Sequence, residues 1–332
     1  MQRRPDSTQT RDHPLVSFFK RRGKRSGLTG VTLYPSGVAV THVERVPGQP
    51  PTLTVCDFEA GNVHSTLLSR LVKKHRLEKS RGVLCLHPSQ YIHALVDRPE
   101  VEDYELEDAL RWRIADLIDY PVTEAVIDTY EVAEGTADSE SNQLGVTIVR
   151  RSVADGFCQT LTEAGLVPVA FDIVELCQRN ISELLPESER GVLLVQLRHT
   201  STQMLGYQKG QLLISRNMAI LGDEVSDELQ SLAEGNRDGG TMLENLTVEV
   251  QRTINFYSSR ARRPPPSGLV QLPFAGELPG LTTHLTQMAD VPARPLDINA
   301  LLESREPIDN ALQAAAIDAI GAALRIEEEV AA

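Results

Sequence analysis

The sequence contains two β-hairpin patterns, far apart in the chain, and helices follow each of them. Residues 30–44 read GVTLYPSGVAVTHVE, with apolar residues alternating on both sides of a Pro-Ser-Gly turn. Residues 192–205 read VLLVQLRHTSTQML, two apolar runs around a small polar turn. Alternation with a period of two, interrupted by turn residues, is typical of hairpins. A hairpin, a further strand and helices, occurring twice, predict an α/β fold with an internal duplication.

Apolar residues at steps of three and four predict the helices between these strands. The clearest stripe, with Leu106, Leu110 and Ile114, lies in EDYELEDALRWRIADLIDYP and ends at Pro121. Ser152 and Thr241 are each followed three residues later by an acidic residue, which predicts a side-chain cap at the start of two helices. The main predicted helices cover residues 64–77, 102–121, 152–165, 241–260, 278–289 and 308–325.

Charge is distributed unevenly along the chain. The 332 residues carry a net charge of −13, whereas residues 1–27 contain eight Lys or Arg and two Asp, so this leader is +6 and the remainder is −19. Nucleic-acid binding needs a dense basic face, which an acidic body lacks. We therefore expect no nucleic-acid partner. With 41% hydrophobic residues, the chain can bury a full core.

The basic leader ends in SFFKRRGKR, and two interpretations of it remain open. It is a solvated tail, or it adsorbs weakly to anionic lipid through aromatic and basic side chains. The residues that would contact lipid are Phe18, Phe19, Lys20, Arg21, Arg22, Lys24 and Arg25. The chain has no signal-peptide core and no run of about 20 apolar residues, which predicts a soluble, cytosolic protein.

Patterns typical of metal sites and of common enzymes are missing from the sequence. The four cysteines lie far apart without a C-x-x-C pair and are expected to be buried, reduced thiols, and the eight histidines are scattered. No metal site is therefore predicted. The sequence also lacks the G-x-S-x-G, H-E-x-x-H, P-loop and G-x-G-x-x-G motifs. The acidic run at residues 102–108 is expected to be a solvated helix face.

Several segments, in order along the chain, resemble the PilM family of type IV pilus assembly proteins. ALRWRIADLIDYPVTEAVIDTYEV is similar to that family's Trp-containing helix, Pro corner and following strand. EAGLVPVAFDI, SRNMAILGDEVSDEL, EVQRTINFY and FAGELPGLTTHL resemble its Gly-Leu-x-Pro turn, its Arg-x-x-x-x-Gly strand end, its Glu-x-x-Arg helix and its glycine loop. The resemblance extends from about Leu28 to Arg325 and is strongest to members associated with mannose-sensitive haemagglutinin (MSHA) pili.

The resemblance implies the actin-like fold of FtsA and PilM, a duplicated ribonuclease H-like α/β ATPase fold with an inserted FtsA-type subdomain. It also implies a division of the chain into parts. These are the leader (1–27), a first lobe (28–87, completed by C-terminal helices at 305–326), the inserted subdomain (88–172) and a second lobe (173–304).

The resemblance further implies a role in protein assembly. PilM-like proteins lie at the cytoplasmic face of the bacterial inner membrane and bind the cytoplasmic N-terminal peptide of a PilN-like membrane protein. That peptide lies in a groove between the first lobe and the insert. Trp112 is the candidate contact residue, and the alternative for it is core packing. Other pilus assembly components and a second copy of the chain, as a homodimer, are further candidate partners.

The sequence departs from the resemblance at the two loops that hold nucleotide phosphates in actin-like ATPases. Each loop usually opens with Asp-x-Gly, because the acid orients Mg²⁺ and water and the glycine lets backbone N–H groups approach. Here Thr32 and Tyr34 occupy the Asp and Gly positions of the first loop. Gln196 and Arg198 occupy those of the second loop. A run of hydroxyl residues follows, namely Thr200, Ser201 and Thr202.

The adenosine side of the cleft is better matched. Glu249 and Arg252 match the family's Glu-x-x-Arg helix, and Gly276 matches its glycine loop. The alternative is that the two charged residues are solvated and that Gly276 serves a turn. ATP binding therefore stays open, whereas hydrolysis is not expected, because phosphoryl transfer depends on positioned charge that both loops have lost.

Three functions follow from these residues. The first is a non-catalytic scaffold that couples pilus components at the inner membrane. The second is an ATPase whose metal site has been rebuilt from other acids, for instance Asp172 or Glu224. The third is a GspL-like component of type II secretion, which shares the fold.

Overall fold

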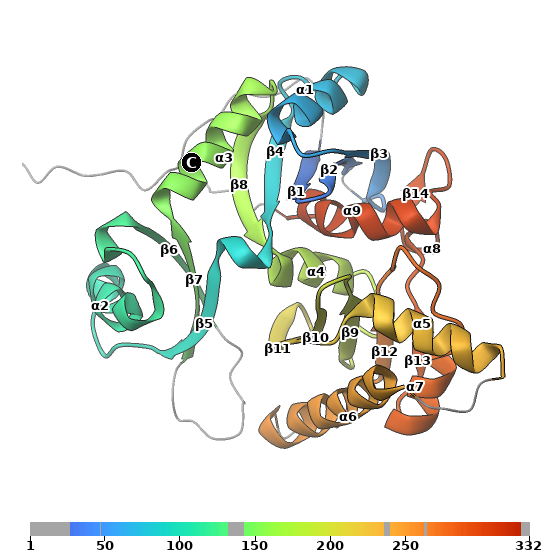
Figure 1. Ribbon diagram of the computed structural model, residues 1–332. Helices are drawn as coiled ribbons and strands as arrows, with labels where there is room; N and C mark the ends of the chain where they lie inside the picture. Colours follow the sequence, from blue (N-terminus) through green and yellow to red (C-terminus); the bar gives the residue numbers. More distant parts are fainter. Residues whose placement is uncertain (1–26, 47, 132–142, 236–239, 262–263, 327–332) are drawn as a thin grey trace, which may run out of the picture.

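The computed structural model describes residues 27–46, 48–131, 143–235, 240–261 and 264–326 (Figure 1). Its first sheet has the strand order β14-β3-β2-β1-β4-β8. The strands β1, β2 and β3 form an antiparallel meander, and β4 and β8 run parallel to β1. Their bounds are β1 Leu28–Tyr34, β2 Gly37–Glu44, β3 Thr52–Ala60, β4 Arg81–Leu86, β8 Val167–Ile173 and β14 Glu303–Ser304.

The second sheet repeats this arrangement with the order β11-β10-β9-β12-β13. Three antiparallel strands are again followed by two parallel ones. Apart from the two-residue strand β14, order and direction agree between the sheets, which confirms the predicted duplication. The bounds are β9 Val192–Leu197, β10 Thr202–Gln208, β11 Gln211–Met218, β12 Gly268–Gln271 and β13 Ala293–Pro295.

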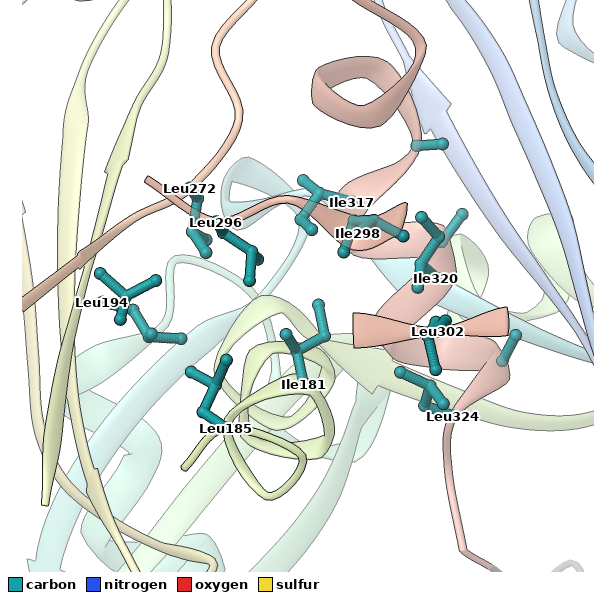
Figure 2. Packing of buried hydrophobic residues seen from close by; sticks show 14 of the residues in the cluster. Ile181, Leu185, Leu194, Leu272, Leu296, Ile298, Leu302, Ile317, Ile320 and Leu324 are labelled. Carbon is teal, nitrogen blue, oxygen red and sulfur yellow. The ribbon is translucent and has the colours of Figure 1, made fainter. Parts of the chain in front are cut away.

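Two helices form a layer between these sheets, α4 (Val174–Ser182) and α9 (Asn310–Ala323) (Figure 1). Ile181 and Leu185 from α4 and its end pack with Ile317 and Ile320 of α9 and with Leu194 of β9 (Figure 2). The outer faces of the sheets are covered by other helices. These are α1 (His64–Lys74) and α3 (Arg151–Glu163) on the first sheet, and α5 (Gly222–Ala233), α6 (Thr241–Ala261) and α7 (Leu281–Ala289) on the second.

Helix α9 lies directly against the backbone of β1. A Cβ atom on Gly30 would collide with the carbonyl oxygen of Ala319, so the close approach requires glycine. The same carbonyl accepts a hydrogen bond of 2.9 Å from Thr41 Oγ1 of β2. The first sheet is therefore completed by a helix from the far end of the chain. A short helix, α8 (Ile298–Leu301), precedes α9.

A third, smaller sheet has the antiparallel order β5-β7-β6, with β5 Ile92–Asp97, β6 Ala125–Glu131 and β7 Gln143–Arg150. Helix α2 (Leu106–Ile114) packs on one of its faces through Leu110 and Ile114. Within residues 88–172, α3 and β8 belong to the first sheet and its cover. The division into lobes and an insert stays a prediction. Single 3₁₀ turns lie at Pro88–Gln90, Asp103–Glu105, Ala115–Leu117 and Val122–Glu124.

The structure corrects four details of the helices. Ser152 lies inside α3, which begins at Arg151 without a side-chain cap. Helix α6 does begin at Thr241, but the amides of Met242 and Leu243 donate to the Glu228 carboxylate of α5. A cap from a neighbouring helix thus replaces the predicted local one. The helix predicted at 102–121 is also divided into α2 and two flanking 3₁₀ turns, and α4 was not predicted at all.

Candidate functional site

The ends of the equivalent strands β1 and β9 meet in one buried polar network between the two sheets. Arg198 Nη2 donates to Asp318 Oδ2 at 2.9 Å and to Gln196 Oε1 at 2.7 Å. The Tyr34 hydroxyl donates to the same Asp318 oxygen at 2.9 Å. Gln178 Nε2, from α4, also donates to Gln196 Oε1. We call these five residues the latch, because they join β1 and α9 to the tip of the second sheet.

The strand pattern explains why these side chains converge. Val192 and Leu194 of β9 point to the middle layer, whereas Leu193 and Val195 point to the outer helices. Because side chains alternate along a strand, Gln196 faces α4 and α9 as well. The turn after β9 is held by Arg198 N–H, which donates to Ser201 O at 2.8 Å. The long guanidinium then reaches Asp318 across the gap between the sheets.

The latch is buried, and its charges are paired. The side chains of Arg198 and Asp318 are 17% and 1% exposed. Burial acts to lower the pKa of Arg198, but the neighbouring Asp318 and Tyr34 overcome it and raise that pKa, so the guanidinium stays charged. Burial, and next the Asp318 charge, hold the pKa of the Tyr34 hydroxyl well above its usual value. Tyr34 therefore remains a hydrogen-bond donor.

Four polar atoms in and beside the latch have no hydrogen-bond partner among the described residues, namely Asp318 Oδ1, Gln178 Oε1, Arg198 Nε and Thr32 Oγ1. Thr32 is 1% exposed and lies two residues before Tyr34 on β1. Buried polar atoms of this kind are commonly satisfied by internal water. The arrangement fits a closed, hydrated ion pair. It offers one carboxylate, already bound to Arg198, where Mg²⁺ chemistry would need free acids.

The hydroxyl run after Arg198 does not join the latch. Thr200 is exposed, and Ser201 is half-buried and contributes its carbonyl to the turn. Thr202 is fully buried, and its hydroxyl donates to Ile220 O at 2.8 Å. The sequence-predicted residues that the structure brings together are thus Tyr34, Gln196 and Arg198, with Thr32 adjacent.

The residues predicted on the adenosine side lie elsewhere. Glu249, on α6, pairs with Arg216 of β11 at 2.7 Å and with Arg252 at 2.7 Å. The Arg252 side chain is 67% exposed, as expected for the solvated alternative. Gly276 lines an open pocket of about 380 Å³ together with Phe274, Leu278 and Asn310. Glu249 is not among the described residues that line this pocket.

The acids proposed for a rebuilt metal site are also separated. Asp172 is buried on β8 and pairs with Arg325 at 3.0 Å, and burial raises its pKa despite that arginine. Glu224 is exposed in the first turn of α5. Within the described parts of the chain, no three His, Cys, Asp or Glu side chains are grouped to hold a metal ion. The four cysteines are free, with Cys85 and Cys177 buried and Cys158 exposed.

A second buried polar cluster joins the small sheet to both halves. The Glu175 carboxylate, on α4, accepts from the Tyr91 hydroxyl at 2.6 Å, from Gln203 of β10 at 3.2 Å and from Ser215 of β11 at 3.1 Å. His93 Nδ1, on β5, lies 3.9 Å from the same carboxylate. The Glu175 side chain therefore connects Tyr91, which precedes α4 in the chain, to strands β10 and β11, which follow it.

Trp112 lies on the surface of α2 with 84% of its side chain exposed, which excludes core packing for it. The apolar residues Leu95 and Val126, on the other face of the small sheet, are 46% and 36% exposed. The lipid-binding residues predicted from Phe18 to Arg25 lie outside the described residues. Among the helices that the structure describes, none has the length and apolarity needed to cross a bilayer.

Asp318 and Gln178 were missed by the sequence reasoning. Asp318 is the one charged residue in NALQAAAIDAIGAA, the sequence of α9. A lone carboxylate on an otherwise apolar helix is expected to have a buried partner, and this was the available signal. Gln178 lies on the unpredicted helix α4, where seven of nine residues are buried, including the polar Glu175, Gln178 and Asn180.

Comparison with known proteins agrees with this architecture. A solved PilM–PilN type IV pilus biogenesis complex matches 90% of this chain and 98% of that chain, with 22% identity and a TM-score of 0.68. The cytoplasmic domain of EpsL, an inner-membrane component of the type II secretion system of Vibrio cholerae, matches with 13% identity, coverage of 89% and 95%, and a TM-score of 0.49. A search of curated proteins finds no significant match.

A third solved structure, the ethanolamine utilization protein EutJ from Carboxydothermus hydrogenoformans, has 12% identity, coverage of 89% and 88%, and a TM-score of 0.48. The likeness to the PilM–PilN structure, with its TM-score of 0.68, confirms the predicted actin-like α/β fold. The family model described as type IV pilus assembly protein PilM matches residues 53–238, which is more than half of the chain. The chain belongs to the PilM family of type IV pilus assembly proteins.

Proposed function

We propose that the chain is a non-catalytic, MshI-like scaffold of an MSHA-type pilus machine at the cytoplasmic face of the inner membrane. In this role it binds the cytoplasmic N-terminal peptide of a PilN-like membrane protein and needs no nucleotide to do so. The observation that carries the proposal is the latch. Arg198 and Tyr34 both bind Asp318, at the two loop positions where an actin-like ATPase would approach phosphate.

In the latch, side chains of the protein itself connect β1 and α9 to the second sheet. A phosphate group arriving there would have to displace a buried ion pair, and separating such a pair is costly. Neither loop retains its aspartate, so a bound Mg²⁺ would also lack its usual orienting acids. These features favour a permanently closed protein over a cycle of binding, hydrolysis and release.

The surface most suited to a short apolar peptide is the small-sheet face that carries Leu95 and Val126. Leu110, Ile114 and α2 cover the opposite face, so the exposed side chains at Leu95 and Val126 remain available. In the same sheet, His93 of β5 and Tyr130 of β6 are joined across β7 by a 2.7 Å hydrogen bond. The exposed apolar side chains of Leu95 and Val126, beside the fixed His93–Tyr130 pair, suit recognition of a peptide by shape.

The test is binding of a labelled N-terminal peptide from a PilN-like protein, measured by fluorescence anisotropy with and without Mg-ATP. We expect the same affinity in both conditions and at least tenfold weaker binding by Leu95→Asp. Val248→Asp, an equally exposed apolar site on α6, is the matched control and should bind normally. Failure of the peptide to bind under either condition would refute the scaffold proposal.

The alternative is a nucleotide-binding protein, favoured by the pocket at Gly276 and Phe274. Isothermal titration with Mg-ATP separates the two functions. We expect no binding heat and no phosphate release from the full chain. Saturable heat that Phe274→Ala abolishes would establish nucleotide binding, and turnover in addition would replace the scaffold with an ATPase.

A further inference from the structure

Helix α2 presents an exposed surface that combines aromatic side chains with carboxylates. Tyr104 and Trp112 are 82% and 84% exposed, although α2 is anchored to the small sheet by Leu110 and Ile114. Exposed acidic residues lie near them in the sequence, on α2 and on the segments at either end of it, namely Glu102, Glu105, Glu107, Asp108, Asp116 and Asp119. We call Tyr104, Trp112 and these carboxylates the acidic-aromatic face. The small-sheet face with Leu95 and Val126 is separate from it.

This face has a chemistry that predicts its ligand. Residues 100–119 contain eight Asp or Glu and only Arg111 and Arg113 as bases, a net charge of −6. Arg111 is held by Glu107 at 2.6 Å and by Val122 O at 3.1 Å. Exposed Trp and Tyr are typical of protein contacts, and the surrounding carboxylates select a positive partner. Aromatic rings also bind cations over their faces.

The chain itself contains a segment of complementary chemistry. The leader is +6, and its SFFKRRGKR sequence places Phe18 and Phe19 directly before five basic residues. Two aromatic rings beside a basic run match an acidic surface that exposes Trp112 and Tyr104. Arginine and lysine over aromatic rings, with charge attraction around them, give a specific but salt-sensitive contact.

The length of the leader limits how far it can reach on its own copy. Ten residues separate Phe18 from Leu28, the start of β1, and they span at most about 36 Å. Strand β1 starts beside the start of β4, because Thr29 pairs with Gly82. The path to α2 runs along β4 and then β5, each about 20 Å long at ~3.3 Å per residue. Figure 1 shows α2 on the outer side of the small sheet.

We propose that residues Phe18 to Arg25 of one copy dock on the acidic-aromatic face of a second copy. The contact is heterologous, because two different surfaces meet, and such contacts join copies head to tail. A row of scaffolds would follow, with each copy leaving its Leu95 and Val126 surface exposed. The contact is independent of the PilN-like peptide, so it can hold or fail regardless of the proposed function.

Trp112 provides the measurement, because it is the only tryptophan in the chain. We expect the emission of the full chain to shift to shorter wavelength as protein concentration rises, in about 0.05 M salt. In about 0.5 M salt, where charges are screened beyond roughly 4 Å, the shift should disappear. Sedimentation velocity on the same samples should show association over the same concentration range.

Matched variants locate the contact. Glu105→Lys with Asp108→Lys on α2 should weaken association at least tenfold, and so should Lys20→Glu with Arg21→Glu and Arg22→Glu in the leader. Glu224→Lys with Asp227→Lys makes the same charge change on α5 and should associate like the wild type. Mixing the α2 and leader variants should restore one contact per pair.

Three results would overturn the proposal. One is Trp112 emission and sedimentation that do not change with concentration. Another is association that survives the leader variant. The third is binding of the leader to anionic phosphatidylglycerol vesicles in the absence of any self-association, which would assign the leader to lipid.

Discussion

The two sheets share one topology, but their first strands, β1 and β9, end in different residues. The topology positions the site, and the residues at the strand ends give it its chemistry. At equivalent places, β1 has Gly30, Thr32 and Tyr34, whereas β9 and its turn have Leu194, Gln196 and Arg198. All face the layer formed by α4 and α9. The strand order therefore determines where these side chains lie. The element packed opposite each position determines which residue type fits there.

The backbone of α9 touches β1, so the first sheet needs Gly30 at the contact. At the end of β1, the group that reaches Asp318 is the Tyr34 hydroxyl. In the second sheet, Leu194 packs in the apolar layer with residues of α9 (Figure 2), and the long Arg198 side chain reaches Asp318. The two tips meet at Asp318 from opposite sides. The two sheets thus have the same topology but make different contacts with Asp318.

The largest effect is expected when the shared carboxylate is removed. Asp318→Ala leaves Arg198 buried without its partner and should lower the free energy of unfolding by about 3–5 kcal/mol. Urea denaturation of the purified chain measures this. Arg198→Met combined with Asp318→Leu should recover most of the loss, and Ser36→Ala, at the exposed first tip, should change little. Equal losses for the single and double variants would mean that Asp318 acts alone.

A larger residue in place of the glycine of β1 tests the close approach of α9, because β9 has a leucine at the equivalent position. Gly30→Ala places a methyl group on the Ala319 carbonyl and should destabilise the chain by about 3 kcal/mol, the upper range for overpacking. The thermal unfolding midpoint reports the change. Gly156→Ala, in α3 with open space around it, should instead stabilise by about 0.5–1 kcal/mol. A neutral Gly30→Ala would show that α9 can move away from β1.

The two halves also differ in what a buried tyrosine binds. Tyr34 donates to the Asp318 carboxylate, whereas Tyr207 of β10 donates at 2.6 Å to the Glu175 carbonyl. Hydrogen bonds to charged groups are stronger, so Tyr34→Phe should cost about 2 kcal/mol and Tyr207→Phe about 1 kcal/mol. Urea denaturation of both variants checks the ranking, and the reverse order would contradict a charged latch.

The smallest effect concerns pH and sharpens the contrast between the latch and the Glu175 cluster. Burial lowers the pKa of His93, and the nearby Glu175 opposes this only in part. The unfolded chain therefore takes up the proton first, and stability should fall as pH drops below about 6.5 toward the lowered folded value. Burial lowers the pKa of His87 as well, so it adds to the same loss.

His93→Gln should reduce this loss of stability between pH 7 and pH 5, measured by thermal unfolding across the range. The Tyr130 hydroxyl, which contacts His93, stays neutral there because burial raises its pKa. The latch has no histidine, so Tyr34→Phe should leave the shape of the pH profile unchanged. A profile that His93→Gln does not alter would assign the pH dependence to His87 alone.

Most of the frame was predictable from the sequence because strand alternation and turn residues are local. The hairpin at 30–44, the meander from Val192 and the helices at 64–77 and 308–325 all match observed elements. Helix α4 could not be found in this way. It has only nine residues and directly follows β8, and polar side chains such as Glu175, Gln178 and Asn180 are buried on it beside apolar ones, so its pattern was too short to separate it from the strand.

The candidate site was predictable only in part. The resemblance to the family's phosphate loops pointed to Tyr34, Gln196 and Arg198 and implied that both loop acids are absent. It could not show that Arg198 would bind Asp318, 120 residues later, because that pairing depends on how the halves close. Sequence also could not show that Glu249, which matches the family's adenosine-side helix, would pair with Arg216 of β11, and its role at a nucleotide stays a prediction.

The contact between β1 and α9 also has a consequence for synthesis. Strand β1 begins at Leu28, near the start of the chain, yet the helix that covers its inner face ends at Ala323. On the ribosome, the first sheet leaves the exit tunnel early with Gly30, Thr32 and Ala39 uncovered, and it stays so while the second half is made. At about 5–20 residues per second, that wait lasts tens of seconds. The chain is thus expected to depend on chaperones until its last helix emerges.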